Sequence, residues 1–139
     1  MAENSSDSAK KTKASASFKK AKSRAEEYVK DSEKLNALID KASKKATHKI
    51  GALNNVWTQL TACFRLIRAY AKGAYREVPW YSIVMIVASV IYFVMPIDLI
   101  PDFIVGFGLL DDAALLGWTV KTFSADIDNF LEWESENAT

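Results

Sequence analysis

Four aspartates after a long apolar run are the side chains of this chain best suited to chemistry. The stretch of residues 95–113, MPIDLIPDFIVGFGLLDDA, contains Asp98, Asp102, Asp111 and Asp112. Its prolines break helices, so we predict a tight non-helical connector on which these carboxylates cluster. Clustered aspartate oxygens suit Ca²⁺ or Mg²⁺, so a divalent cation is one candidate cofactor, although the sequence does not identify a cofactor.

Two other roles for these carboxylates remain open. An ionisable group near membrane depth is a candidate for proton relay or catalysis. In the structural alternative, Asp98 and Asp102 accept hydrogen bonds from N–H groups of the turn, and Asp111 or Asp112 caps the next helix. The aspartates lack the spacing of an EF-hand and have no histidine partner, and this favours the structural alternative.

The other reactive side chains do not point to catalysis. His48 and Cys63 have no partner at the spacing of a metal site or of an activated nucleophile. We expect His48 to be solvated and Cys63 to be buried. The sequence assigns no catalytic residue and favours a non-enzymatic function over an enzyme.

The apolar run itself covers residues 78–97, which are twenty residues without a charge. Because strands span about 4–8 residues, its length predicts a helix, over residues 79–95 between two prolines. Such a helix is ~25 Å long, slightly shorter than a hydrocarbon core of ~30 Å. Trp80, Tyr81 and Tyr92 at its ends resemble interfacial aromatic belts. We therefore expect a transmembrane helix, with the central helix of a soluble bundle as the alternative.

Charge divides the chain into two halves. The 139 residues contain 18 Lys and Arg and 17 Asp and Glu. Residues 1–76 hold 17 basic and 7 acidic side chains (+10), whereas residues 77–139 hold 1 and 10 (−9). The 50% hydrophobic composition excludes a wholly disordered chain, and the single cysteine excludes a disulfide scaffold.

The basic half is predicted to be a helical region, residues 18–76, behind a disordered Ser, Ala and Lys-rich tail, residues 1–17. From Phe18 onward, apolar residues recur in alternating steps of three and four, the spacing of a heptad seam. Gly51 lies beside a stutter in this pattern, and we expect two helices, 18–48 and 52–76. The seam predicts a coiled coil, so a homo-oligomer is possible.

The second of these helices presents basic residues beside its apolar stripe: Arg65, Arg68, Lys72 and Arg76. A basic amphipathic helix before an apolar span suits anionic lipid headgroups. Residues 41–76 hold eight basic and no acidic residues, so the positive-inside rule predicts a cytoplasmic N-terminus in the cell membrane. Nucleic acid is disfavoured as a partner, because acidic residues dilute the basic tail and no reading motif follows.

The acidic half continues after the connector, residues 96–110, with a predicted amphipathic helix over residues 111–133 and an acidic tail, residues 134–139. Residues 103–120 are too acidic to insert independently, and a re-entrant hairpin is the alternative to a second crossing. We group residues 77–133 as one membrane domain.

A family resemblance rests on the residues Tyr92, Pro96, Asp98, Pro101, Asp102, Gly108, Asp111 and Asp112. Read as Y-x₃-P-x-D-x₂-P-D-x₅-G-x₂-D-D, they resemble the signature of the YkvA-like family, a domain of unknown function. The resemblance implies a small, mainly bacterial, membrane-associated helical protein without an established enzymatic activity.

These observations predict an all-α, membrane-anchored protein with one firm apolar helix. Its expected function is membrane association together with protein–protein interaction. The alternative is a cation-binding or proton-handling membrane protein, or an enzyme, that uses the aspartates.

Overall fold

The structure, a computed structural model, describes residues 20, 22–95 and 112–137. Each regular element in these residues is a helix, so the predicted all-α fold class is confirmed. The expected tail, residues 1–17, and the connector, residues 96–110, lie outside the described residues.

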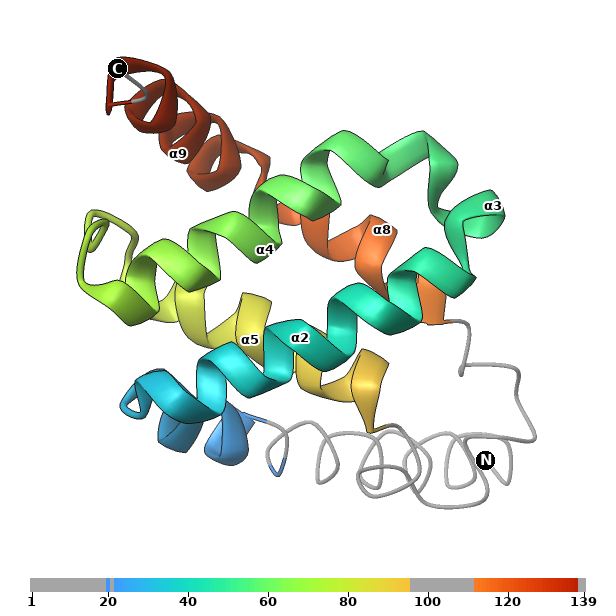
Figure 1. Cartoon of the computed structure of the whole chain (residues 1–139), viewed down its shortest axis with the longest axis horizontal. Helices are drawn as coiled ribbons and strands as arrows, with labels where there is room; N and C mark the ends of the chain where they lie inside the picture. Colours follow the sequence, from blue (N-terminus) through green and yellow to red (C-terminus); the bar gives the residue numbers. More distant parts are fainter. Residues whose placement is uncertain (1–19, 21, 96–111, 138–139) are drawn as a thin grey trace, which may run out of the picture.

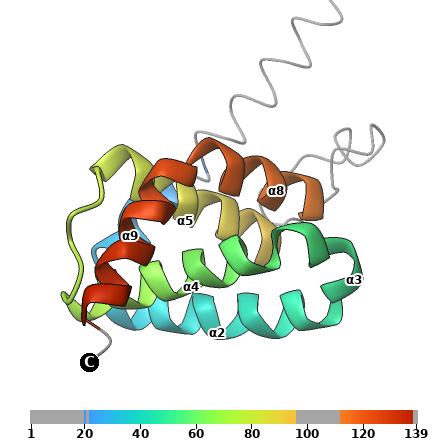
Figure 2. The same cartoon turned by 90° about the horizontal axis from the view of Figure 1, so that it is seen from above.

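The helices α2, α4, α5 and α8 are arranged in two layers (Figures 1 and 2). Their bounds are Ser32–His48, Trp57–Lys72, Trp80–Val94 and Asp112–Thr122. α2 and α4 run antiparallel in one layer, and α5 and α8 run antiparallel in the other. Two short elements, α3 (Ile50–Leu53) and the 3-10 helix η1 (Asn54–Val56), connect α2 to α4, and α9 (Ser124–Asn137) packs on α4.

The helix predicted over residues 18–48 is broken at Asp31. Residues 22–29 are helical, and α2 then begins anew because the Asp31 carboxylate accepts hydrogen bonds from Glu33 N (3.1 Å) and Lys34 N (3.2 Å). This N-cap satisfies donors that a helix start leaves unpaired. The predicted single helix is therefore wrong, because a local cap ends the heptad pattern.

The heptad seam of α2 packs against other helices of the same chain. Leu35, Ile39, Ala42 and Ala46 are buried, and α2 packs against α4 and α5. The apolar stripe thus contributes to the core of this chain. It is covered by α4 and α5 of the same chain and not by a second copy in a coiled coil.

The break expected near Gly51 is confirmed, since α3 and η1 separate α2 from α4. The predicted end of the next helix at residue 76 is wrong by four residues. Gly73 has a φ of 77°, and its N–H caps α4 by bonding to carbonyls of the last turn. Glycine adopts this left-handed conformation without the steric cost of a side chain, so α4 ends at Lys72.

The apolar helix predicted over residues 79–95 is confirmed as α5, Trp80–Val94, with Pro79 as its N-cap residue. All residues from 82 to 91 are buried, on every face of the helix. α5 packs against α2 and α8 and, less extensively, against α4. α5 is thus a central helix of the bundle, which was the alternative to a lipid-facing span.

Among the helices of the described residues, none combines the length and the apolar character that crossing a bilayer needs. The transmembrane helix expected over residues 79–95 is therefore not found among the described helices. The physical reason is that α5 has 15 residues and its side chains meet other helices of the same chain.

A pair of buried hydroxyl groups joins α5 to α8. Thr119 Oγ1 lies 2.8 Å from Ser89 Oγ and 2.9 Å from Leu115 O, and Ser89 Oγ donates to Met85 O (3.0 Å). Each hydroxyl thus has a partner although both side chains are buried. The contact between the two hydroxyls adds one polar interaction between otherwise apolar helices, and the carbonyl partner of each hydroxyl lies in its own helix.

The helix predicted over residues 111–133 bends at Phe123 and extends further, so that α9 includes residues assigned to the acidic tail. Beyond the bend, Phe130 and Trp133 contact Tyr75, at ring-centroid distances of 5.2 and 5.1 Å. This aromatic cluster fixes α9 to the segment after α4. The bend lets the part before it pack mainly on α5, whereas the part after it packs on α4.

The position of α5 in the core predicts different effects for the same substitution at two sites. Ile86 is 0% exposed and Ile50 is 50% exposed. We expect Ile86→Ala to lower the free energy of unfolding by about 2–5 kcal/mol, because it leaves a cavity. Ile50→Ala is the matched control and is expected to change it by about 0.5 kcal/mol or less. Urea denaturation measures both; equal effects would contradict the packing described.

Candidate functional site

Most of the predicted carboxylate turn lies outside the described residues. This holds for Asp98, Asp102 and Asp111, and also for Pro96, Pro101 and Gly108. Asp112 is the first residue of α8. Within residues 20, 22–95 and 112–137, no group of three or more His, Cys, Asp or Glu is placed to hold a metal ion. The divalent-cation site at the four aspartates stays a prediction.

The two ends between which the turn runs are firmly placed. The last turn of α5 and the first turn of α8 lie at the same end of the bundle (Figures 1 and 2). Lys45 Nζ of α2 donates to Phe93 O (2.5 Å) and lies 4.9 Å from the centre of the Phe93 ring. The ammonium group satisfies one of the carbonyls that a helix end leaves unpaired and opposes the negative end of the dipole. Tyr92, the first motif residue, is half-buried on the same turn.

The four basic residues predicted at the membrane surface have different environments. Arg65 binds Glu134 of α9 with two hydrogen bonds (2.8 and 3.1 Å), and Arg68 binds Asp40 of α2 (2.5 Å). The first pair shows that the basic and acidic halves contact each other within one chain. Lys72, by contrast, is exposed.

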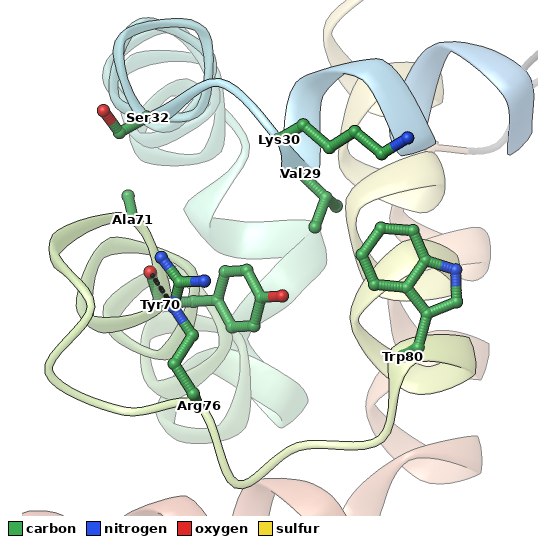
Figure 3. A pocket seen from close by; sticks show the side chains of 7 residues that line it. All are labelled: Val29, Lys30, Ser32, Tyr70, Ala71, Arg76 and Trp80. Carbon is green, nitrogen blue, oxygen red and sulfur yellow. Dashed lines mark hydrogen bonds between the residues drawn. The ribbon is translucent and has the colours of Figure 1, made fainter.

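Arg76, the fourth of these residues, belongs to a pocket of about 330 Å³. The lining residues are Val29, Lys30, Ser32, Tyr70, Ala71, Arg76 and Trp80. They come from the end of the first helical segment, the start of α2, the end of α4, the loop between α4 and α5, and the start of α5 (Figure 3). The pocket is open to solvent and combines two cationic side chains with two aromatic rings.

The geometry around Arg76 is specific. Its Nε donates to Tyr70 O (2.9 Å), and its guanidinium carbon lies 4.3 Å from the centre of the Tyr70 ring. This stacking holds the planar guanidinium against the pocket wall. Figure 3 shows the Tyr70 ring between the guanidinium and the Trp80 indole, and the Lys30 ammonium on the side of Trp80.

Large apolar side chains are also exposed on the layer of α5 and α8. Trp80, Tyr81 and Trp118 are 47%, 62% and 50% exposed. The Tyr81 ring lies 6.3 Å from that of Phe123, directly after α8, so the start of α5 adjoins the end of α8. We call Trp80, Tyr81 and Trp118 the aromatic surface.

Two ionisable groups of the core have raised pKa values. Burial raises the pKa of the Cys63 thiol from 9.0 to about 12. Burial, and then the negative charges of Glu77 and Asp126, raise the pKa of Tyr75. A buried thiol that stays protonated at neutral pH is a poor nucleophile, as expected for Cys63. His48 is exposed, again as expected.

The sequence is similar to known proteins along α5 and the connector. Residues 82–118 match a family described as "Protein of unknown function (DUF1232)". The chain is 32% identical over 74 residues to the "Uncharacterized membrane protein YkvA" of Bacillus subtilis (strain 168), and the match covers 53% of this chain and 70% of the relative. The chain belongs to the YkvA-like family. No solved structure gives a significant match.

The family match places the core helix α5 and the greater part of α8 in the YkvA-like domain. The pocket lies outside the residues that match the family model, because all of its lining residues precede residue 82. Sequence reasoning identified Arg76 and Trp80 separately but missed their association with Lys30 and Tyr70. The signal in the sequence was the cation and aromatic pair, Arg76 just before α5 and Trp80 at its start. Their partner Lys30 is too distant in sequence to be found by spacing.

The raised pKa of Cys63 predicts a loss of stability at alkaline pH. The unfolded thiol ionises above its ordinary pKa of 9.0, whereas the folded thiol stays neutral until about pH 12. Stability is therefore fully present below pH 9.0 and falls as the pH rises through this window, by up to ~1.4 kcal/mol per unit from this group. Urea denaturation between pH 8 and 10 should show a shallower decline for Cys63→Ala; identical slopes would contradict the burial of the thiol.

Proposed function

We propose that this protein is a non-enzymatic, membrane-associated protein that binds the bilayer surface and there interacts with other proteins. The similarity to a relative named as a membrane protein supports membrane association. The protonated, buried Cys63 thiol supports binding rather than covalent catalysis.

The observation that carries the proposal is the aromatic surface on the layer of α5 and α8. Trp80, Tyr81 and Trp118 are large side chains, each about half exposed or more. Tryptophan and tyrosine prefer the membrane interface, where an apolar ring and a polar N–H or O–H are both satisfied. An aromatic surface on a folded helical protein is suited to insertion among lipid headgroups.

The position of α5 supports a surface mode of binding. Its residues from 82 to 91 are already covered by protein, so exposing them to lipid would require the helices around it to separate. The aromatic surface provides apolar contact with lipid without any such opening.

The basic residues support a position of the described helices on the cytoplasmic side of the membrane. Lys72 is the last residue of α4 and Arg76 lies between α4 and α5, both close in sequence to Trp80, and residues 41–76 contain no acidic side chain. The cytoplasmic leaflet is anionic and attracts each nearby basic residue by ~1 kcal/mol. We therefore propose that the described helices, including the N-terminal half, face the cytoplasm.

Cell fractionation tests the proposal. Tagged protein should sediment with membranes and be released by a carbonate wash, because surface association does not survive high pH. Protein in the soluble fraction from the start would contradict membrane association, and release by detergent alone would contradict the surface mode. Protease added outside intact cells should leave both termini uncut.

Substitution of the aromatic surface tests which side chains bind. We expect Trp80→Ala, Tyr81→Ala and Trp118→Ala together to weaken binding to lipid vesicles by on the order of tenfold or more, because apolar area is lost. Ile50→Ala, an exposed apolar change on α3, is the control and should bind as the original chain does. Flotation with vesicles measures both, and equal binding of the triple variant would reject the aromatic surface as the contact.

A further inference from the structure

We propose that the pocket between Lys30, Arg76, Tyr70 and Trp80 binds a phosphate ester, and that in the cell this is the headgroup of an anionic phospholipid. The inference rests on the proposed membrane association for the source of the phosphate. The site itself follows from the side chains that line the pocket.

The first step concerns the cations. The hydrogen bond from Arg76 Nε to Tyr70 O uses one of the five donors of the guanidinium. Across the described part of the chain, the Arg76 side chain forms no further hydrogen bond or ion pair, and the Lys30 side chain forms none. A guanidinium that is oriented by stacking and has donors to spare is suited to bidentate binding of phosphate. Lys30 supplies a second positive charge to the same pocket.

The second step concerns the carboxylates adjacent in sequence, which would oppose an anion. Asp31 follows Lys30, but its Oδ1 accepts hydrogen bonds from the backbone of α2. Glu77 follows Arg76, but it is exposed, so solvent and salt screen its charge. Neither carboxylate lines the pocket, so the cations of the pocket are not neutralised from within it.

The third step concerns the aromatic and apolar wall. Trp80 is half exposed, Val29 and Tyr70 are buried, and all three line the pocket (Figure 3). An inorganic anion needs only the charges, whereas a ligand that joins a phosphate to an apolar part would use the indole as well. Trp80 also belongs to the aromatic surface, so an occupied pocket would lie at the depth of the headgroups.

Vesicle flotation with paired charge variants tests the site. The full-length chain is mixed with phosphatidylcholine vesicles that contain or lack phosphatidylglycerol. The pocket variant is Lys30→Gln with Arg76→Gln, and the control is Lys41→Gln with Lys44→Gln, which loses two exposed cations of α2 outside the pocket. We expect the pocket variant to bind the anionic vesicles about tenfold more weakly than the control, because hydrogen bonds to charge are lost in addition to general attraction. Equal losses would overturn the site and leave membrane association standing.

Arg76→Gln also removes the contact with Tyr70, so a second variant separates binding from folding. Arg76→Lys loses the same contact but keeps the charge, so its melting temperature should match that of Arg76→Gln, while it should bind anionic vesicles more weakly than the original chain because the planar, bidentate group is gone. Binding equal to that of the original chain would overturn the role assigned to the guanidinium.

The fluorescence of Trp80 distinguishes the two sources of phosphate. Emission is compared between the original chain and Trp80→Phe while anionic vesicles or glycerol 3-phosphate are added. A Trp80 signal with vesicles alone supports the lipid headgroup, and a signal with glycerol 3-phosphate at similar concentration supports the pocket but overturns the lipid source. If the chain does not bind vesicles, the proposed function fails, and the glycerol phosphate titration still decides whether the pocket binds phosphate.

Discussion

The constraint on which this structure depends is that α5 is apolar on all of its faces. A helix of this kind needs apolar surroundings on every side, and α2, α4 and α8 provide them. The heptad seam of α2 and the stripe of α4 are used to cover α5 and each other. Two layers of antiparallel helices follow from that requirement (Figure 2).

The polar contacts of the bundle define how the helices cover α5. Ser89 and Thr119 pair between α5 and α8, and Lys45 of α2 binds the last turn of α5 at Phe93 O. Partly exposed ion pairs such as Arg65 with Glu134 contribute little energy, but they connect helices that are distant in sequence. The contact of Lys45 with Phe93 O holds the last turn of α5, which directly precedes the aspartate connector in the sequence.

The sequence predicted those features that depend on one segment. The bounds of α5 follow from its length and from Pro79, and the break near Gly51 follows from the stutter. Two helix ends were missed because a single residue decides each of them, the Asp31 carboxylate and the left-handed Gly73. We expected lipid around α5, whereas other helices of the chain surround it in the structure. The sequence of an apolar run of this length does not distinguish a cover of lipid from a cover of protein. The pocket could not be predicted, because Lys30, Tyr70 and Trp80 meet only once the helices have packed.

The central claim is that α5 stays covered by protein while Trp80, Tyr81 and Trp118 contact lipid. Photo-crosslinking with a phospholipid that carries a reactive group on its acyl chain tests it, when labelled positions are mapped to single residues by fragmentation. The account predicts label on the aromatic surface and none on residues 83–91 of α5. Label distributed along residues 83–91 would contradict it, because those side chains would then face lipid.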